Sequence, residues 1–351
     1  MHLEIVRLAQ PLKAPYRLSF GTVGVFETLI VRIVRDDGVS GLGEITPLPG
    51  YSDETIASAI EATTVVARDL AAGVRWSAAL DKISEGNPMV VSGIATAMET
   101  ATDFAGIFAR PAAARPIPLA ALCDGETDAE VAASARRLVA AGFRHFKMKA
   151  GLGDVAADIH RVRIASAAAG PGIDISIDAN QSLSERDAET LCAAAADLPV
   201  RLVEQPFMPD QWHAFARLAA STPTALMLDE SIWTEADIRK AAEVGATHVK
   251  LKLCKHPGIG ETLRLLAIAR DLGLGVAFGN GVQGAVGNHI EAYLYEAAGL
   301  DTPAELNGVL KVARDPFRGA FEVSGGHMTA GGLQTLDPAG LAPIADAAFT
   351  A

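Results

Sequence analysis

The sequence predicts an α/β protein in which a closed barrel of alternating strands and helices follows a smaller α+β domain. From Pro116 onward, short apolar segments alternate with alanine-rich helical segments in units of about 25–30 residues, and seven or eight such units fit a (β/α) barrel. Several helical segments end at a glycine, the usual C-terminal cap. Residues 1–50 instead resemble antiparallel strands. A doubly wound open sheet is the alternative architecture.

The N-terminal part is expected to combine strands with helices. Residues 3–12 and 27–45 are typical of strands, with a turn at Asp36-Asp37-Gly38. Residues 53–73 begin with an acidic first turn and end at Gly73, as a helix does, and residues 92–110 continue with a second helical pattern.

Prolines and a glycine-rich tail suggest the domain boundaries. Pro111 and Pro116 separate the first part from the repeating units, and the short-stranded tail is expected to return to the first domain. We therefore predict one domain over residues 1–115, joined by 321–351, and a barrel domain over 116–320.

Eight strands are predicted in the barrel domain, each a short apolar segment. They cover residues 117–123, 145–150, 174–180, 201–207, 225–231, 247–253, 275–280 and 304–308. The clearest helical segments between them cover residues 128–142, 153–170, 235–246 and 260–273.

The composition excludes several classes of partner. The 351 residues are 50% hydrophobic and carry a net charge of −12, a field that repels nucleic acid and anionic membranes. The chain shows neither a signal-peptide pattern nor an uncharged apolar run of membrane-spanning length, so we expect a cytoplasmic protein. Its three cysteines, Cys123, Cys192 and Cys254, form no CxxC pair, which argues against a disulfide framework or a zinc ribbon.

Charged residues gather at the ends of five consecutive predicted strands. Unpaired buried charges are costly, whereas the C-terminal ends of barrel strands face the active site. Because alternate side chains share a face, both lysines of each pair should line the barrel interior, with the acids between them. These residues are Lys147 and Lys149, Asp178 and Asn180, Glu204, Asp229 and Glu230, and Lys250 and Lys252.

This arrangement suits proton abstraction next to a carboxylate. Three carboxylates with open positions suit Mg²⁺, which would stabilise the enediolate that forms when the α-proton of a bound carboxylate leaves. A lysine would be the base, and a neighbouring ammonium or the metal would lower its pKa. Two lysines on opposite faces would allow a proton to leave one side and return on the other.

The ordered motifs FKMK, IDAN, VEQP, LDES and KLCK, at residues 146–149, 177–180, 203–206, 228–231 and 252–255, resemble the enolase superfamily. Within it they are similar to the muconate-lactonizing-enzyme subgroup, which includes dipeptide epimerases, N-acylamino acid racemases, o-succinylbenzoate synthases and cycloisomerases. The resemblance covers nearly the whole chain. It implies a capping domain and a modified (β/α)7β barrel.

The resemblance implies a role for each strand-end residue. The metal ligands for Mg²⁺, with Mn²⁺ as the other ion considered, would be Asp178, Glu204 and Asp229. The two bases would be Lys149 and Lys252, although Lys250 competes with Lys252 for the second role. The expected supporting residues are Lys147, which would tune Lys149 and reach the substrate carboxylate, Asn180, Glu230, which would pair with a lysine across the barrel, and Lys255. The resemblance also implies a homo-oligomer.

Other segments depart from the family pattern or belong to loops. The eighth strand reads Glu305-Leu306-Asn307 where dipeptide epimerases carry Asp-x-Asp, which grips a substrate ammonium. The seventh strand ends in GNGVQG, which includes Asn280 and is polar where many relatives are apolar. Loops 19–24 and 47–54 are expected to close over the barrel, with Phe20 and Tyr51 as substrate contacts.

The sequence therefore predicts an Mg²⁺-dependent racemase or epimerase of an amino-acid derivative or dipeptide. Its expected partner is a small carboxylate substrate, and neither nucleic acid nor a membrane is expected to bind. Cycloisomerisation and β-elimination are the alternatives within the family. Two other classes stay open: a metal-binding barrel without catalysis, and a nicotinamide-linked oxidoreductase, because residues 151–156 match a loose G-x-G-x-x-A fingerprint.

Overall fold

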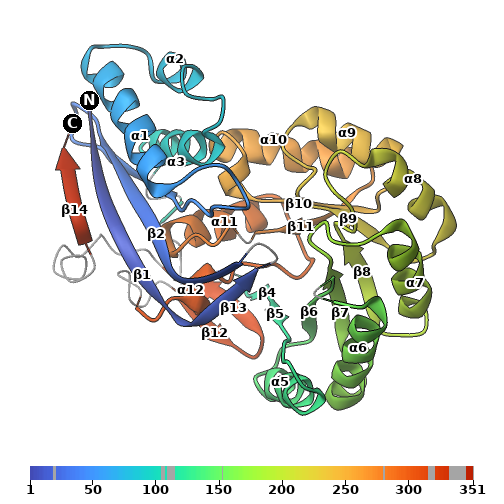
Figure 1. Ribbon diagram of the computed structural model, residues 1–351. Coiled ribbons are helices and arrows are strands. Elements are labelled where there is room, and N and C mark those ends of the chain that lie inside the picture. Colours follow the sequence, from blue (N-terminus) through green and yellow to red (C-terminus); the bar gives the residue numbers. More distant parts are fainter. Residues whose placement is uncertain are drawn as a thin grey trace.

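The computed structural model describes residues 1–18, 21–103, 107–108, 115–151, 153–279, 281–314, 321–331 and 345–350. A sheet flanked by helices forms a cap at the N-terminal end, and a ring of short strands surrounded by helices forms a barrel beside it (Figure 1). Within the described residues, no helix is long and apolar enough to cross a membrane.

The cap sheet joins both ends of the chain. Its strand order is β14-β1-β2-β3, and β14 pairs antiparallel with β1, so that Glu4 lies opposite Thr350. The turn predicted at Asp36-Asp37-Gly38 connects β2 to β3, and Gly38 has a φ of 82°. The division of the chain at residue 115 stays a prediction. The strands are β1 (His2–Leu18), β2 (Gly21–Val34), β3 (Ser40–Ile45) and β14 (Ala345–Thr350).

Helices α1 and α3 pack against the cap sheet, with α2 beside α1, and glycines let α3 approach β3 closely. A Cβ on Gly43 would lie 1.9 Å from the carbonyl oxygen of Gly93, so only glycine allows α3 to lie this close to β3. The same helix also contacts the barrel, since Ser92 Oγ donates to the Leu253 carbonyl at 2.6 Å. The helices are α1 (Ile56–Ala71), α2 (Trp76–Asp81) and α3 (Pro88–Thr100).

The barrel strands are parallel and follow the order of the chain. The sheet runs β5-β6-β7-β8-β9-β10-β11 without the reversal of strand order that a doubly wound sheet requires. The strands are β5 (Ala120–Leu122), β6 (His145–Lys149), β7 (Asp174–Asp178), β8 (Val200–Glu204), β9 (Leu226–Leu228), β10 (His248–Leu251) and β11 (Gly275–Phe278).

The predicted eighth strand closes the barrel with only a few hydrogen bonds. Glu305 N donates to the Phe278 carbonyl at 2.9 Å, on the β11 side. On the other side, Ala120 N donates to the Ala304 carbonyl at 2.9 Å, and Ala304 N donates to the Pro118 carbonyl at 2.8 Å. The expected (β/α)7β barrel is therefore confirmed, and the open sheet is wrong.

Helices alternate with the barrel strands and cover their outer side (Figure 1). Side-chain caps start several of them: Thr127 and Glu130 form a capping box at α5, and Thr234 and Asp237 do so at α9. The helices are α5 (Asp128–Ala140), α6 (Val155–Ala169), α7 (Glu185–Ala195), α8 (Trp212–Ser221), α9 (Glu235–Glu243), the 3₁₀ turn η1 (Leu253–Lys255), α10 (Gly258–Asp271), α11 (Ala285–Ala297) and α12 (Gly308–Lys311).

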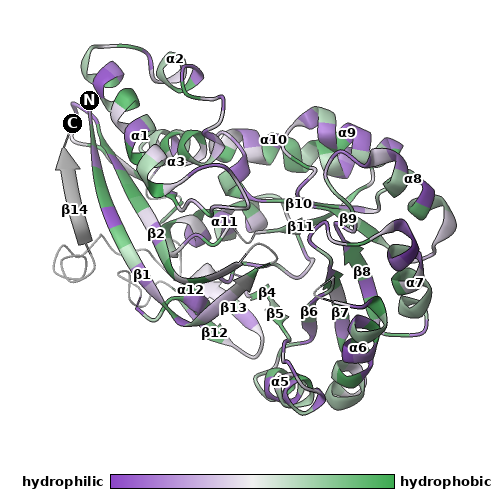
Figure 2. Cartoon of the chain, in the orientation of Figure 1, coloured by the Kyte–Doolittle hydropathy of each residue, from purple (hydrophilic) through white to green (hydrophobic). Residues whose placement is uncertain are grey.

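A small third sheet lies at the start of the barrel. The hairpin of β12 (Phe321–Ser324) and β13 (His327–Ala330) pairs with β4 (Ile117–Pro118). Apolar residues predominate along β2, whereas polar and apolar residues alternate along the helices α5 to α9 around the barrel (Figure 2).

Candidate active site

The deep layer of the site consists of two lysines and two glutamates inside the barrel: Lys147, Lys250, Glu204 and Glu305. Lys147 Nζ lies 2.9 Å from Glu204 Oε2 and 3.0 Å from Glu305 Oε2. Lys250 Nζ lies 2.7 Å from Glu204 Oε1 and also contacts Glu305. All four side chains are buried. Each ammonium is therefore compensated by carboxylates, as a buried charge requires.

The outer layer lies nearer the barrel mouth, two residues further along the strands that carry the lysines. It consists of Lys149, Asp178, Lys252 and Asp229. Lys149 follows Lys147 by two residues on β6, and Lys252 follows Lys250 by two at the end of β10, which moves each about 7 Å along its strand. Lys149 Nζ lies 2.8 Å from Asp178 Oδ2, and Lys252 Nζ lies 2.7 Å from Asp229 Oδ2.

The two outer lysines lie on opposite sides of the carboxylates. The strand order places β7, β8 and β9 between β6 and β10, and these three strands carry or lead into the three acids. Asp178 and Glu204 are paired neighbours in the β7–β8 register. The structure thus brings together the strand-end residues that the sequence identified, with acids in the centre and lysines on either side.

Asn180 and Glu230 extend the Lys149 side of the site. Lys149 donates to Asn180 Oδ1, and Asn180 Nδ2 donates to Glu230 Oε1 at 2.9 Å. The expectation that Glu230 pairs with a lysine is wrong for the described residues, because the Asn180 amide takes that place. Burial raises the pKa of Glu230, and the Asp229 and Asp178 charges add to this effect.

The cap contributes Tyr51 to the side of the site that carries Lys252. Lys252 Nζ donates to Tyr51 Oη at 3.0 Å, and Tyr51 Oη donates to Asp229 Oδ1 at 3.3 Å. The Tyr51 ring lies 6.3 Å from the Trp233 ring, centroid to centroid. The predicted loop contact Tyr51 therefore does reach the strand ends, whereas Phe20 and Asn280 lie outside the described residues.

Lys255 donates hydrogen bonds to Asp229 and to the segment that follows it. Its ammonium donates to the Asp229 carbonyl at 2.6 Å, to Asp229 Oδ1 at 2.9 Å and to the Ile232 carbonyl at 3.1 Å. Burial lowers the pKa of Lys255. Three bonds to the segment that carries Asp229 make Lys255 a positioning residue for this carboxylate.

Gln205, which sequence analysis did not single out, also fixes Asp229. Its φ of 37° is in the left-handed region, which costs on the order of 1–3 kcal/mol for a non-glycine residue. The side chain compensates: Gln205 Oε1 accepts from Asp229 N at 2.9 Å, and Gln205 Nε2 donates to Phe207 O and Ser231 Oγ, both at 2.8 Å. The only sequence signal was its place in the VEQP motif.

The electrostatics of the carboxylates differ with their partners. Burial opposes the charge of Asp178, but Lys147 and Lys149 outweigh it and hold the pKa below its usual range. Burial and the nearby Asp178 instead raise the pKa of Glu204 to about 7. The pKa of Asp229 is held well below its usual range, because Lys252 and Lys255 outweigh the cost of burial.

The outer lysines do not show the lowered pKa expected of a base. Burial disfavours the charged form of Lys149 and Lys252, yet the neighbouring carboxylates, led by Asp178 and Asp229 respectively, raise both pKa values. The physical reason is that each ammonium lies against an acid that is itself a candidate metal ligand.

The acids fit a hard metal ion by their chemistry. Asp178, Glu204 and Asp229 are buried and offer only carboxylate oxygens, the ligands that Mg²⁺ prefers. In the neighbouring Glu230, Oε2 is buried and has no hydrogen-bond partner among the residues that the structure describes. Among the described residues, no three such side chains converge closely enough to chelate an ion, because lysine ammonium groups contact these carboxylates instead.

The end of the barrel-closing segment carries Asn307 and a lysine that sequence analysis missed. Asn307 Oδ1 accepts a hydrogen bond from Lys311 Nζ, while Glu305 points inward to Lys147 and Lys250. Lys311 lies four residues beyond Asn307 on α12, past the end of any strand pattern. No strand-based argument could have found it.

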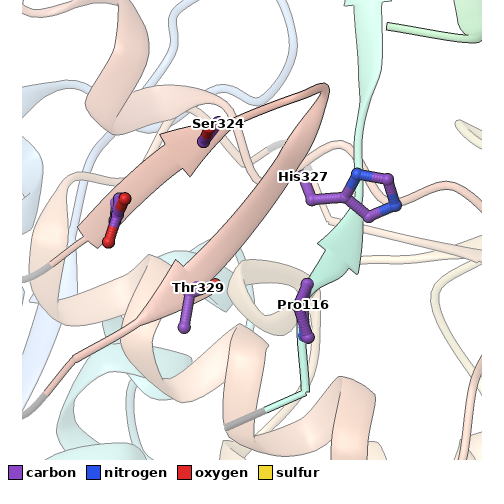
Figure 3. Close-up of a pocket in the computed structure, with 5 residues that line it drawn as sticks. Pro116, Ser324, His327 and Thr329 are labelled. Carbon is purple, nitrogen blue, oxygen red and sulfur yellow. The ribbon is translucent and has the colours of Figure 1, made fainter. Parts of the chain in front are cut away.

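A cavity of about 340 Å³ lies away from these residues (Figure 3). It is next to β4 and the β12–β13 hairpin, and the predicted site residues do not line it. The lining residues are Pro116, Glu322, Ser324, His327 and Thr329. The strand-end residues, rather than this cavity, are the candidate site.

Comparison with known proteins identifies the family. Residues 1–103 match the mandelate racemase/muconate lactonizing enzyme N-terminal domain, and residues 130–336 match the enolase C-terminal domain-like family. An aromatic dipeptide epimerase of Herpetosiphon aurantiacus is 29% identical over 348 residues, 94% of each chain. Muconate cycloisomerase 1 of Pseudomonas putida is 28% identical over 83% of this chain and 82% of that protein.

A solved structure shows the same fold. The dipeptide epimerase of Cytophaga hutchinsonii, complexed with Mg and the dipeptide D-Ala-L-Val, superimposes with a TM-score of 0.86 at 23% identity, over 100% of this chain and 99% of that one. The two family matches, which cover most of the sequence, show that the chain belongs to the mandelate racemase/muconate lactonizing enzyme family of the enolase superfamily and is an enzyme of that family.

Proposed function

We propose that this enzyme removes the proton α to a substrate carboxylate and returns it on the opposite face, so that it racemises or epimerises an amino-acid derivative or dipeptide. The observation that carries the proposal is the position of Lys149 and Lys252 on opposite sides of three strand-end acids. A substrate carbon held between them has one amine available on each face. General acid–base catalysis of this kind contributes roughly 10²- to 10⁴-fold in rate.

Asp178, Glu204 and Asp229 would hold Mg²⁺, or Mn²⁺ in its place. When bound, the ion would neutralise charge on the substrate carboxylate as the α-proton leaves. Binding would also draw the carboxylates away from the lysine ammonium groups. That exchange of partners would remove the contacts that raise the pKa of Lys149 and Lys252.

The geometry favours Lys252 over Lys250 as the second base. Lys250 is fully buried and lies between Glu204 and Glu305, so its charge stabilises the barrel interior. Lys252 lies nearer the mouth, where Tyr51 covers it. Lys147 would keep a positive charge beneath Lys149 and so favour the neutral form of that base.

Cycloisomerisation is the second candidate, because the similar proteins include a muconate cycloisomerase. In that reaction, or in a β-elimination, one lysine would move the proton and the other would only stabilise charge. The two outcomes differ in whether both outer lysines are required.

Hydrogen exchange tests the proposal directly. The purified protein with Mg²⁺ is incubated in D₂O with a library of dipeptides, N-acylamino acids, proline analogues and muconates, and deuterium at the α-carbon is followed by proton NMR. We expect exchange with inversion for at least one amino-acid derivative. If no racemisable carboxylate exchanges its α-proton, the proposed function is wrong.

A further inference from the structure

The two outer lysines differ in how their backbones are held. Lys149 is the last residue of β6 and still lies opposite Asp178 in the register with β7. The registers of β10 end earlier, at Val249 towards β9 and at Leu251 towards β11. Lys252 therefore follows the last paired residue of its strand, and its position depends on contacts of another kind.

The residue that follows Lys252 is held from two sides. Ser92 Oγ, from helix α3 of the cap, donates to the Leu253 carbonyl at 2.6 Å. The Leu253 N–H makes a backbone hydrogen bond to the side chain of Glu291, which comes from helix α11 of the barrel. Ser92 and Glu291 are 1% and 0% exposed, so both contacts lie away from bulk water, where a hydrogen bond is stronger. Cap and barrel together thus fix the chain one residue beyond the second base.

Glu291 serves here as a neutral hydrogen-bonding group rather than as a counter-ion. Burial raises its pKa to about 8, and the Glu44 charge adds to this effect. Hydrogen bonds from Asn288 and from the Leu253 N–H, together with the Lys252 charge, oppose it. A protonated carboxyl group still accepts through its carbonyl oxygen. Asn288 Nδ2 donates to Glu291 Oε2 at 2.9 Å and so orients the side chain.

The cap helix that carries Ser92 is itself fixed at both ends. In its first turn, Val90 N donates to Glu54 Oε1 at 3.1 Å. Near its end, Glu99 Oε1 accepts from Gly260 N, in the first turn of α10, at 3.1 Å. Such carboxylates are favourable at helix N-termini, because the N–H groups there lack partners within the helix. Helix α3 therefore holds Ser92 in a set position against the barrel.

We propose that Ser92 and Glu291 are positioning residues for Lys252. They hold Leu253 from the cap and from the barrel, and so fix how far the Lys252 ammonium reaches into the site. Lys149 needs no such contacts, because its strand stays paired up to the residue itself. The inference rests on the proposed function, in which Lys252 serves one face of the substrate carbon, and it adds a way in which the cap acts on that face alone.

Amide hydrogen exchange of the Mg²⁺-loaded protein, read by mass spectrometry, tests these contacts without a substrate. Ser92→Ala and Glu291→Met each remove one contact and keep most of the side-chain volume. We expect the peptide that spans residues 250–256 to exchange about ten-fold faster in either variant, the effect of losing one buried hydrogen bond. The peptide that ends at Lys149 should exchange at an unchanged rate.

Deuterium uptake at the substrate α-carbon then shows whether Lys252 alone is affected. The amino-acid derivative that the D₂O screen identifies is supplied as single enantiomers, and the one that Lys149→Met still exchanges is assigned to Lys252. We expect Ser92→Ala and Glu291→Met to lower kcat for that enantiomer by about ten- to a hundred-fold, the cost of a small misplacement, and to leave the other within about two-fold.

Two further variants separate position from general stability. Thr96→Val removes a hydroxyl one turn further along α3, where Thr96 Oγ1 is buried and has no hydrogen-bond partner within the described part of the chain, and it should change neither measurement. Glu291→Gln keeps an acceptor for the Leu253 N–H and should retain exchange of both enantiomers at pH 7. Retained exchange of the enantiomer that Lys149 serves shows that a variant is folded.

Three results would overturn the inference: equal loss for both enantiomers, unchanged rates for both, or an unchanged amide exchange rate over residues 250–256. If the unaltered enzyme exchanges neither enantiomer of any compound in the screen, the proposed function fails instead. Amide exchange alone then decides whether Ser92 and Glu291 fix this segment.

Discussion

The deep and outer layers each contain two lysines, and on each side of the site the two lysines are two residues apart in the sequence. The surroundings of the deep lysines nevertheless differ from those of the outer lysines. The deep lysines, Lys147 and Lys250, share Glu204 and Glu305 inside the barrel. The outer lysines, Lys149 and Lys252, each contact one aspartate near the mouth, and 17% of the Lys149 side chain is exposed. Depth along the strand, rather than residue type, therefore separates charges that stabilise the interior from charges that can meet a substrate.

The outer layer should give the largest effect on activity. Replacing Lys149 or Lys252 by Met should lower the racemisation rate by roughly 10²- to 10⁴-fold, since one face then lacks its acid–base group. Lys240→Met, on the outer helix α9, is the control and should keep full activity. Polarimetry measures the rates. A single variant that keeps more than a tenth of the activity would favour a one-lysine reaction.

Asp178 links the two layers, because it contacts both Lys147 and Lys149. Asp178→Asn should weaken Mg²⁺ binding on the order of 100-fold, because one anionic ligand is lost. Asp174→Asn, at the exposed start of the same strand, is the matched control. Titration calorimetry with Mg²⁺ compares them. An unchanged affinity for Asp178→Asn would contradict its assignment as a ligand.

The deep layer should affect stability most. Lys250→Met leaves Glu204 and Glu305 with one shared ammonium in place of two, and should lower the free energy of unfolding by about 3–5 kcal/mol. Adding Glu305→Gln should recover part of this loss, because the excess negative charge is removed. Urea unfolding measures all three proteins. If Lys250→Met unfolds at the same urea concentration as the unaltered protein, the deep lysines are not structural.

Glu291, a buried acid near Lys252, should give an effect on stability that appears only as the pH rises. Burial raises the pKa of Glu291 to about 8, so the folded state holds its proton more tightly than the unfolded chain does. This contribution is complete below pH 4.5 and is lost as the pH rises towards 8. Glu291→Gln should be more stable at pH 8 by on the order of 3 kcal/mol, with little difference at pH 4.5.

Thermal unfolding at the two pH values checks this prediction. Asn288 Nδ2 donates to Glu291 Oε2 at 2.9 Å, a bond that glutamine can also accept. Equal stabilisation at both pH values would show that packing, rather than ionisation, distinguishes the two side chains.

Sequence alone predicted the barrel and the group of strand-end acids and lysines, because both depend on local periodicity. The alternation of Lys147, Met148 and Lys149 was enough to place both ammonium groups in the interior, while Met148 packs outward. The contacts that depend on tertiary structure could not be predicted. Asn180, whose backbone has a φ of 40°, donates to Glu230 where a lysine was expected.

Contacts between cap and barrel were partly predictable. Tyr51 was expected from its glycine- and proline-rich loop, but its bond to Lys252 joins residues 201 positions apart. The contact between Lys311 and Tyr16 had no local signal in the sequence. Lys311 lies on the short helix α12 of the predicted barrel domain, whereas Tyr16 lies in β1 of the predicted cap domain.

The central claim is that Lys149 and Lys252 act on opposite faces of one carbon, and stereospecific exchange tests it most directly. Each enantiomer of a substrate is incubated in D₂O with Lys149→Met or Lys252→Met, and α-deuteration is followed by proton NMR. We predict that each variant exchanges only one enantiomer and that the two variants exchange opposite ones. Loss of exchange from the same enantiomer in both variants would contradict the two-face arrangement.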